Sequence, residues 1–402
     1  MFELGCYDPG VPPATCVAYQ KEVEQITQLP LANVADGADK LKFRPLPPAT
    51  ADAMSILAVQ RALKSAGFFP GAQEDGICGY RTQSAIRLFQ EYVRSVEKLD
   101  CVPDGRFGPQ SQKHLQRWLD QRLTPNWAPA IAQWKSGAFG DSEYGQWLAL
   151  LDQVKQKYLA APNRMLQMVN AFAGPADTRK VAQWDFSPTG SPQLIGIRRD
   201  EFSGKFDDIM ILLIKGLVFK FQGSTEPGAT ENPAGAPFLA HGQHNYRFGW
   251  HRWVYLALLP QRNGVLVARA KKNLMLQDSD LDAGLEANTT INVHWAGLGM
   301  KYDVGNWSEG CQVMNGSVYI DAGNQLVNCT SFAAVNQSEV NSNPGKTRGA
   351  YNVLLDLVTA LASDETERTI RYTLLAERDL ALAPALQQGL ADARSRAIKM
   401  MG

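Results

Sequence analysis

The residues best suited to covalent chemistry are a histidine and a cysteine close to each other in the chain, His294 and Cys311. A thiol is a weak nucleophile at neutral pH until a base or a positive charge promotes the thiolate, and imidazole is a natural base for this step. Gly310, just before the cysteine, allows a close backbone approach, so that amide N–H groups can face a developing oxyanion. Cys311 and His294 are thus a candidate nucleophile and a candidate base, and Ser308 could donate a hydrogen bond into the same loop; their spacing in the chain does not show that the two side chains meet.

Other interpretations of the cysteines stay open. A free cysteine is most often a small buried hydrophobe, and a disulfide between Cys311 and Cys329 would remove the nucleophile. The six cysteines include no Cys-x2-Cys pair, which argues against a structural zinc site. The pairs close enough in sequence for disulfides are Cys6/Cys16 and Cys78/Cys101.

Three of the five histidines fall within a short segment, at His241, His244 and His251. Such a density is one mark of a metal site. However, His-x2-His is not a standard helical ligand pair, no flanking Asp or Glu supplies a carboxylate, and Gly242 favours a loop. We expect no metal and no cofactor here, and we interpret these residues as substrate contacts on a loop or as structural side chains.

The elements that would position this chemistry are mainly strands from about residue 180 onward. Their β-branched and alternating patterns predict strands and hairpins at 193–198, 209–221, 253–260 with 264–270, and 289–294. The segment 209–218 is also the longest apolar run, and its length and β-branched content favour a buried strand. Helical spacing at 349–362 and 384–400 surrounds a further strand at 368–376.

An internal repeat organises residues 53–123. Asp75-Gly76-Ile77-Cys78-Gly79 recurs as Asp104-Gly105-Arg106-Phe107-Gly108, and Thr82 then corresponds to Ser111. Each copy has a Gly-containing turn, a hydroxyl residue and an amphipathic helix. The segment therefore predicts a small helical module with two similar turns.

This stretch resembles a small three-helix peptidoglycan-binding domain. The motifs that carry the resemblance are Val59-Gln60-Arg61-Ala62-Leu63, Gly67-Phe68-Phe69-Pro70-Gly71, the Asp75 turn with Thr82, and Ala85-Ile86-Arg87-Leu88-Phe89-Gln90. It implies contacts to peptidoglycan from Asp75, Gly76, Thr82, Asp104 and Gly105. The alternative is that these are only turn and core residues of a structural module.

The region 200–340 resembles the catalytic domain of L,D-transpeptidases, the YkuD-type cysteine enzymes of bacterial cell walls. Their signature is a histidine on a strand followed by a loop like Ser308-Glu309-Gly310-Cys311; Asp207–Phe221 resembles their first hairpin and Asn232–Phe238 one of their turns. The resemblance implies that Cys311 is the nucleophile and His294 the base, with Gly310 and the Cys311 amide at the oxyanion site.

This sequence departs from the family pattern at three places. Glu309 stands where a second histidine is usual, Trp295 where glycine is usual, and Gln312-Val313 replaces an apolar-Arg pair. These departures indicate a divergent branch and weaken the choice of transfer over hydrolysis. The residues that we expect to contact substrate are Trp295, Trp307, Glu309, Gln312, His244 and His251.

The resulting prediction is a multidomain α+β chain. It comprises a lead segment at 1–50 with one short helix near Tyr19–Thr27, the peptidoglycan-binding-like helices at 51–124, a helical connector at 125–178, and a mainly-β catalytic domain with C-terminal helices at 179–402. The length of 402 residues accommodates two or three domains.

The charge balance and the apolar content of the sequence limit the classes of partner that the protein can have. With 40 Lys+Arg against 40 Asp+Glu, no electrostatic attraction to nucleic acid or anionic membrane is expected. No apolar run reaches the length of about 18 residues that a membrane helix needs. The N-terminus shows no basic and apolar signal pattern, so we expect synthesis in the bacterial cytoplasm without a recognisable signal peptide and action in the periplasm or cell wall.

The function expected from these features is a peptidoglycan-modifying cysteine enzyme acting on stem peptides. It would cross-link or exchange D-amino acids through a thioester, or hydrolyse the stem peptide as a carboxypeptidase or endopeptidase. An exported antibacterial effector would fit, with a secretion-apparatus component and an immunity protein as partners. The alternative outside catalysis is a wall-binding component that has lost activity.

Overall fold

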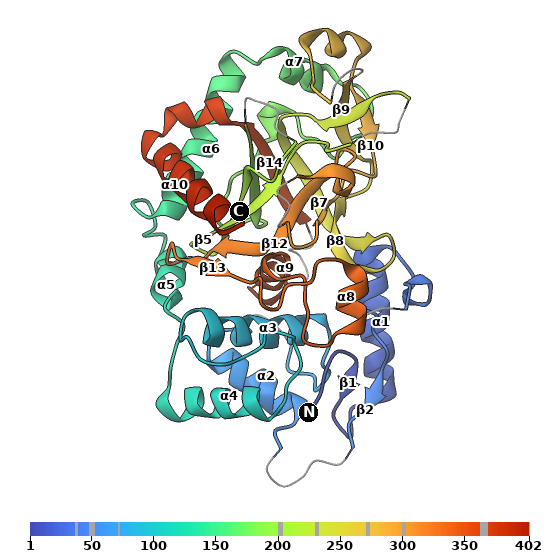
Figure 1. Ribbon diagram of the computed structural model, residues 1–402, viewed down its shortest axis with the longest axis vertical. Helices are drawn as coiled ribbons and strands as arrows, with labels where there is room; N and C mark the ends of the chain where they lie inside the picture. The colour runs from blue at the N-terminus through green and yellow to red at the C-terminus, as the bar shows by residue number, and fades with distance from the viewer. Residues whose placement is uncertain are drawn as a thin grey trace.

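The structure is a computed structural model that describes residues 1–36, 39–47, 53–70, 73–199, 204–229, 233–270, 274–299, 303–361 and 369–401. Helices of the N-terminal part lie at one end of the molecule, and a large curved sheet with its covering helices fills the other (Figure 1). None of the helices in these ranges is long and apolar enough to cross a bilayer.

The larger sheet closes on itself. Its strands run in the order β11-β8-β7-β14-β3-β4-β5-β12-β13 within the described chain, and β11 also pairs with β12, so that the first eight form a barrel. Their bounds are β3 (Gln193–Arg198), β4 (Asp208–Ile214), β5 (Leu217–Ser224), β7 (Gly242–His251), β8 (Tyr255–Pro260), β11 (Val293–Trp295), β12 (Gln312–Ile320), β13 (Leu326–Asn328) and β14 (Thr369–Ala376). A smaller sheet joins β10 (Glu286–Asn288), β9 (Val265–Ala270) and β6 (Ala236–Leu239).

Both faces of the central strands are buried. On β4, the residues Met210 and Leu212 share one apolar cluster with α9 (Ala350–Leu361), whereas Ile209 and Ile211 share another with α6 (Glu143–Ala160) and α10 (Pro384–Met401). A strand that is buried on both faces has a continuous run of apolar residues, because neither face is exposed to water. The predicted mixture of helix and sheet is confirmed, but the β part is a barrel covered by helices rather than the mainly-β domain that we expected.

The long apolar run at 209–218 is two strands rather than one. Lys215 and Gly216 have φ values of 49° and 84° and turn the chain between β4 and β5. A side chain at Gly216 would collide with the carbonyl of Ala130, at 2.7 Å from an ideal Cβ, so glycine is required by both conformation and space. The run is a hairpin with a tight turn inside it.

Two other strand predictions need correction. The predicted hairpin of 253–260 with 264–270 is wrong, because β8 pairs with β7 and β11 whereas β9 pairs with β6 and β10 in the other sheet. The histidine segment expected to be a loop is the strand β7, and its Gly242 packs against Trp184. By contrast, β3 coincides with the predicted strand, and the tail matches the predicted helix–strand–helix order, with positions 362 and 368 outside the described residues.

The helical module consists of α2 (Ile56–Ser65), α3 (Tyr80–Ser95) and α4 (Pro109–Gln121), and the predicted connector holds α5 (Ala128–Ser136), α6 and α7 (Arg164–Ala171). The lead segment is more ordered than expected. Its helix α1 (Pro13–Thr27) starts at a proline, which suits a first helical turn, and it is flanked by β1 (Cys6–Tyr7) and β2 (Arg44–Pro45). The Asp8 carboxylate accepts hydrogen bonds from the Ile56 and Leu57 amides at 2.8 Å and so caps α2.

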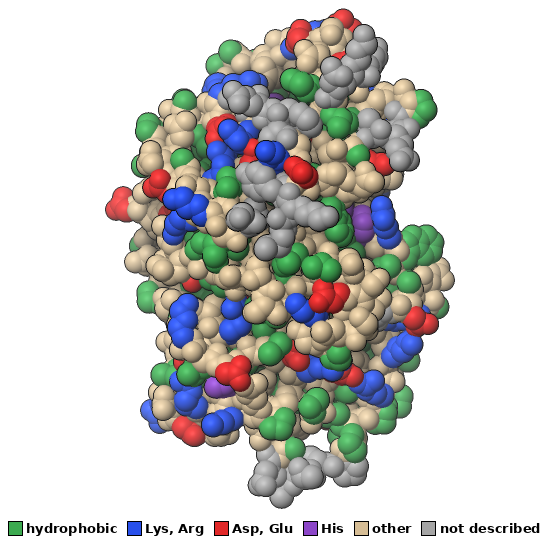
Figure 2. All heavy atoms as spheres, viewed as in Figure 1, with side chains coloured by type: hydrophobic (Ala, Val, Ile, Leu, Met, Phe, Trp, Pro, Cys, Tyr) green, Lys and Arg blue, Asp and Glu red, His purple; other side chains and the backbone are tan. Residues whose placement is uncertain are grey.

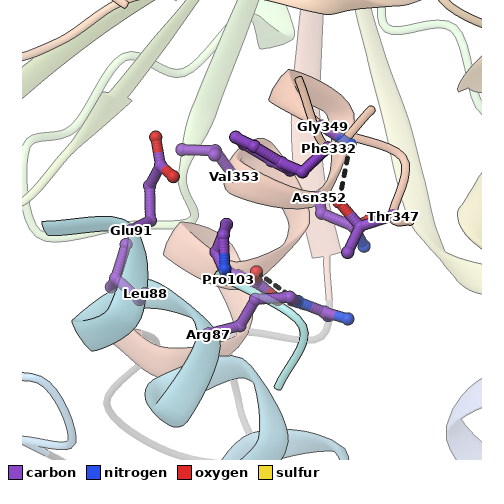
Figure 3. Close-up of a pocket in the computed structure, with 10 residues that line it drawn as sticks. Arg87, Leu88, Glu91, Pro103, Phe332, Thr347, Gly349, Asn352 and Val353 are labelled. Atoms are coloured by element: carbon purple, nitrogen blue, oxygen red, sulfur yellow. Dashed lines mark hydrogen bonds and ion pairs between the residues drawn. The ribbon is translucent and has the colours of Figure 1, made fainter. Parts of the chain in front are cut away.

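The module is fixed to the barrel part by α3, which packs on α9. Arg87 of α3 makes a two-pronged ion pair with Asp356 of α9, both bonds at 2.7 Å. Arg87 and Asp356 both line a cavity of about 10 Å³ that has room for one water, and Figure 3 shows Arg87 with other lining residues from α3 and α9. Further along α3, Glu91 accepts a hydrogen bond from the Tyr319 hydroxyl at 2.6 Å.

Candidate functional site

Cys311 lies at the end of a loop that leads directly into β12. The buried Ser308 hydroxyl donates to the Cys311 carbonyl at 2.7 Å and accepts from the Gly310 amide at 3.1 Å, so that one side chain holds the turn. Gly310 has a φ of 126°, and an added Cβ would lie 2.5 Å from the Pro237 carbonyl. The turn therefore requires glycine at position 310 and is held by the hydroxyl of Ser308.

His294 lies on β11, which pairs in parallel with β12. In this register His294 stands opposite Val313, two residues beyond Cys311. Because side chains alternate between the faces of a strand, Cys311, Val313 and His294 point to the same face of the sheet. The pairing thus makes the predicted nucleophile and base diagonal neighbours on one face.

The orientation of His294 is determined by the backbone. Its Nδ1–H donates to the Trp295 carbonyl at 2.8 Å, which leaves Nε2 as the ring's acceptor atom. In sites with a nucleophile and a base, a third group often orients the base. The Trp295 carbonyl can take this part, because it selects the tautomer of His294 and holds the ring.

A second imidazole lies against the first. The rings of His251 and His294 stack with centroids 4.0 Å apart. Asn292 connects this pair with the cysteine, because its side-chain Nδ2 donates to His251 Nδ1 at 3.3 Å and its amide N–H donates to Cys311 Sγ at 3.4 Å. The resulting cluster, which we call the thiol–imidazole cluster, comprises Cys311, His294, His251 and Asn292.

The cluster is electrically neutral at rest. Burial raises the pKa of Cys311 to about 11, with Glu309 adding to the rise and the Asn292 amide and Arg252 opposing it. Burial lowers the pKa of His294 to about 4 and that of His251 to about 3, the latter also through the charge of His294. Among the described residues no hydrogen bond joins the thiol to either ring; it donates to the Thr290 carbonyl at 3.3 Å. Proton transfer to an imidazole therefore requires the thiol to turn from Thr290.

The predicted oxyanion donors differ in availability. The Gly310 amide is already engaged by Ser308. The Cys311 amide N–H makes no hydrogen bond within the described part of the chain. Only the amide of the nucleophile itself is thus ready to receive a developing negative charge.

The residues expected to contact substrate separate into exposed and buried groups. Trp307 is 39% exposed and Glu309 is exposed, both in the loop before Cys311, and His251 is half-buried. Trp295 is buried between Trp307 and Arg348. Gln312 is also buried. The Tyr372 hydroxyl donates to its side-chain Oε1 at 2.8 Å, and its side-chain Nε2 donates to the Gly310 carbonyl at 3.3 Å, so the Gln312 side chain supports the loop from within the protein.

The other histidines of β7 are placed apart from this cluster. His244 is fully buried, with Thr178 donating to its Nδ1 at 2.9 Å and its Nε2–H donating to the Ala240 carbonyl at 3.0 Å. Burial lowers the pKa of His244 and of His241 to about 3. No set of three or more His, Cys, Asp or Glu side chains arranged to hold a metal ion occurs in the described residues.

The residues expected to bind peptidoglycan form two equivalent internal networks. In the first turn, Gln60 donates to Asp75, Thr82 and the Ile77 carbonyl, at 2.8 to 3.0 Å, and accepts from the Gly76 amide at 2.9 Å. In the second turn, Gln90 makes the corresponding contacts with Asp104, Ser111, the Arg106 carbonyl and the Gly105 amide. The polar atoms of the two Asp–Gly turns thus have partners inside the module.

Residues missed by sequence reasoning are Asn292, the centre of the thiol–imidazole cluster, and the two glutamines as organisers of the turns. The signal for Gln60 and Gln90 was present, since each precedes its Asp–Gly turn by about the same distance. Nothing local marks Asn292, because its importance comes from the pairing of β11 with β12. No family model, curated protein or solved structure matches this chain.

Proposed function

We propose that the protein is a peptidoglycan-modifying cysteine enzyme that acts on stem peptides. The observation that carries the proposal is the arrangement at the start of β12. The Cys311 thiol and the His294 imidazole project from one face, and His294 is held by the Trp295 carbonyl. The Cys311 amide has no hydrogen-bond partner among the residues that the structure describes. A nucleophile, an oriented base and an oxyanion donor are the parts that acyl transfer from an amide requires.

In the proposed reaction, Cys311 attacks the carbonyl of the third residue of a tetrapeptide stem. His294 Nε2 takes the thiol proton, and the Cys311 amide donates to the oxyanion. The tetrahedral intermediate expels the terminal D-Ala as an amine, which receives the proton back from His294, and a thioester remains. An acceptor amine then completes a cross-link or an exchange of D-amino acids, and water instead completes hydrolysis.

The helical module would hold the sugar–peptide polymer near this site. Its fixed contact with α9 through Arg87 and Asp356 supports this role, because a rigid connection presents bound polymer in one orientation. On the face seen in Figure 2, acidic and basic side chains are interspersed among the described residues, which suits a polar and nearly neutral ligand better than a polyanion.

The test is mass spectrometry of purified tetrapeptide muropeptides and intact sacculi after incubation with wild type, Cys311→Ala and, as a matched control, Cys16→Ala. We expect wild type and the control to release D-Ala, or to exchange it for an added D-amino acid, and Cys311→Ala to do neither. The product masses separate hydrolysis from transfer. Activity that persists in Cys311→Ala would overturn the mechanism.

A second candidate is a wall-binding component without catalysis. One observation favours it: the thiol donates to Thr290 rather than to an imidazole, and its pKa is raised. In that case wild type and Cys311→Ala would both bind sacculi, and neither would change any muropeptide. Cleavage at another bond of the stem would instead indicate an amidase or endopeptidase on the same site.

We also propose a biological role for the protein, that of an antibacterial effector. A secretion apparatus would deliver it to the target cell, and an immunity protein would neutralise it in the producing cell. Directing wild type to the periplasm of a susceptible bacterium should then cause lysis, and directing Cys311→Ala there should not. Equal growth of both strains would argue against the effector role while leaving the enzymatic proposal to the muropeptide assay.

A further inference from the structure

The first eight residues of the chain run alongside both turns of the repeat. Phe2 forms an antiparallel bridge with Phe107, and Tyr7 forms one with Ile77. The second bridge is extended by a hydrogen bond of 2.8 Å from the Cys78 amide to the Cys6 carbonyl. In this register Cys6 stands opposite Cys78 and shares that place with Gly5, whose amide donates to the Cys78 carbonyl at 2.8 Å.

The second turn of the repeat shows how the side chains of two bridged residues contact each other. Cys78 and Phe107 occupy the same position in their respective Asp–Gly turns, the residue before the final glycine. At the second turn, Phe107 meets Phe2 from the N-terminal segment, with the rings stacked 5.2 Å apart. At the first turn, the equivalent place is occupied by Cys78 and its partner from the same segment is Cys6.

We propose that Cys6 and Cys78 are a disulfide-forming pair that closes when the protein enters an oxidising compartment. Directly opposed residues of an antiparallel pair have Cα atoms about 4.5 to 5.5 Å apart, which lies within the range of about 4.4 to 6.8 Å that disulfides span. Both side chains are buried in the same apolar cluster and both are thiols in the structure. The inference does not depend on the proposed function.

The surroundings of the two sulfurs suggest an order of steps. The Arg44 guanidinium donates from Nε to Cys6 Sγ at 3.4 Å, so a cationic group lies beside Cys6, and we assign Cys6 as the attacking group. Burial raises the pKa of Cys78 well above its usual range, and the charge of Cys6 adds to this effect.

The chemistry is thiol–disulfide exchange with the disulfide form of a small thiol, such as oxidised glutathione. The Cys6 thiolate attacks one glutathione sulfur, the glutathione disulfide bond breaks, and one reduced glutathione leaves. Cys78 then attacks the Cys6 sulfur and releases the second glutathione. Two cysteine thiols are oxidised to one disulfide, and one glutathione disulfide is reduced to two thiols that carry the protons.

The pairs suggested by sequence distance are less well placed. Cys16 lies on α1, where burial and the charge of Asp75 raise its pKa. Cys101 lies beside the second turn, among Asp104, Asp100 and Glu91. The backbone register brings only Cys6 and Cys78 face to face among the described cysteines.

The experiment is refolding of the full chain in a buffer of reduced and oxidised glutathione, followed by alkylation of free thiols, trypsin digestion and mass spectrometry without reduction. Cys78 is the single cysteine of the peptide 65–81, but Cys6 and Cys16 share the peptide 1–21. The decisive variant is therefore Cys16→Ala. We expect 1–21 linked to 65–81 in wild type and in Cys16→Ala, and no such link in Cys6→Ala or Cys78→Ala.

A thermal scan provides an independent measurement. Closing the long loop between Cys6 and Cys78 should raise Tm of wild type and of Cys16→Ala by about 5 °C on oxidation, with no rise in Cys78→Ala. A link from 1–21 to 65–81 that disappears in Cys16→Ala, a link between 65–81 and 99–106, or free thiols at both cysteines under all conditions would each overturn the proposal.

Discussion

The thiolate fraction of Cys311 depends on the burial of the thiol and on the charged side chains around it. Desolvation holds the thiol and both imidazoles of the thiol–imidazole cluster in their neutral forms near pH 7. Two exposed side chains act on this balance in opposite directions: Arg252 lowers the pKa of Cys311, and Glu309 raises it. Glu309 is thus a group that disfavours the thiolate of Cys311.

At this scale we predict the response of Cys311 to alkylation. In wild type the rate of reaction with iodoacetamide should rise steeply from pH 7 to pH 10, since the thiolate fraction grows toward a pKa of about 11. Glu309→Gln should speed the reaction at pH 8 and Arg252→Ala should slow it, each by about twofold to threefold because exposed charges are screened. Peptide-resolved mass spectrometry gives the rate at Cys311 alone.

Lys113→Gln is the matched control, because this exposed lysine lies on α4 in the helical module, and its rate should equal that of wild type. A fast rate that stays level from pH 6 upward would contradict the prediction, since it would mean that the thiolate and an imidazolium are already paired.

At the scale of single elements, the two Asp–Gly turns are positioned by glutamines from the preceding helices. Each glutamine side chain uses both its donor and its acceptor atoms, and the turn groups it contacts are largely hidden from water. The motif that resembles a peptidoglycan-binding signature is therefore in large part a folding motif. Ligand contacts from this module would have to come from neighbouring exposed atoms.

We predict that Gln60→Leu and Gln90→Leu each lower the free energy of unfolding by about 2 to 3 kcal/mol, because each leaves buried polar groups of a turn without a partner. Gln116→Leu, on the exposed surface of α4, should change it by less than about 0.5 kcal/mol. Urea denaturation measures all three. Loss of sacculus binding at unchanged stability would instead assign the turns to ligand recognition.

At the scale of the whole molecule, the helical module and the barrel are joined by a buried ion pair. Burial raises the pKa of Asp356, and the charge of Arg87 opposes this rise. The buried Asp356 carboxylate is therefore stabilised only while Arg87 is beside it. The nearby bond from Tyr319 to Glu91 adds a second polar connection between α3 and β12. We expect the two parts to unfold together.

Removal of one partner tests this connection. Arg87→Met should lower the free energy of unfolding by about 3 to 5 kcal/mol, because it leaves the Asp356 carboxylate buried and unpaired. The double variant Arg87→Met/Asp356→Leu should recover most of that loss, since apolar side chains of similar size replace the pair. Urea denaturation followed at two wavelengths measures both. Additive losses in the double variant, or two separate transitions in wild type, would show that the parts are independent.

What could be predicted from the sequence was local. The strand at 193–198, the terminal helix, the repeat with its Gly turns and the Ser-x-Gly-Cys loop are each determined by neighbouring residues, through alternation, helical spacing or the conformational freedom of glycine. Cys311 and His294 were also chosen from the sequence, as a nucleophile and base that the resemblance to L,D-transpeptidases links, and their roles stay a prediction.

Only the tertiary structure decided which distant segments meet. The period of a strand specifies which side chains share a face but not which strand lies beside it, so the separation of β8 from β9 and the pairing of β11 with β12 could not be read from spacing. The same long-range registers place His251 against His294, Asn292 against Cys311, and Cys6 opposite Cys78. Partners in a sheet are chosen by the burial of whole faces, which is a property of the folded chain rather than of any segment in it.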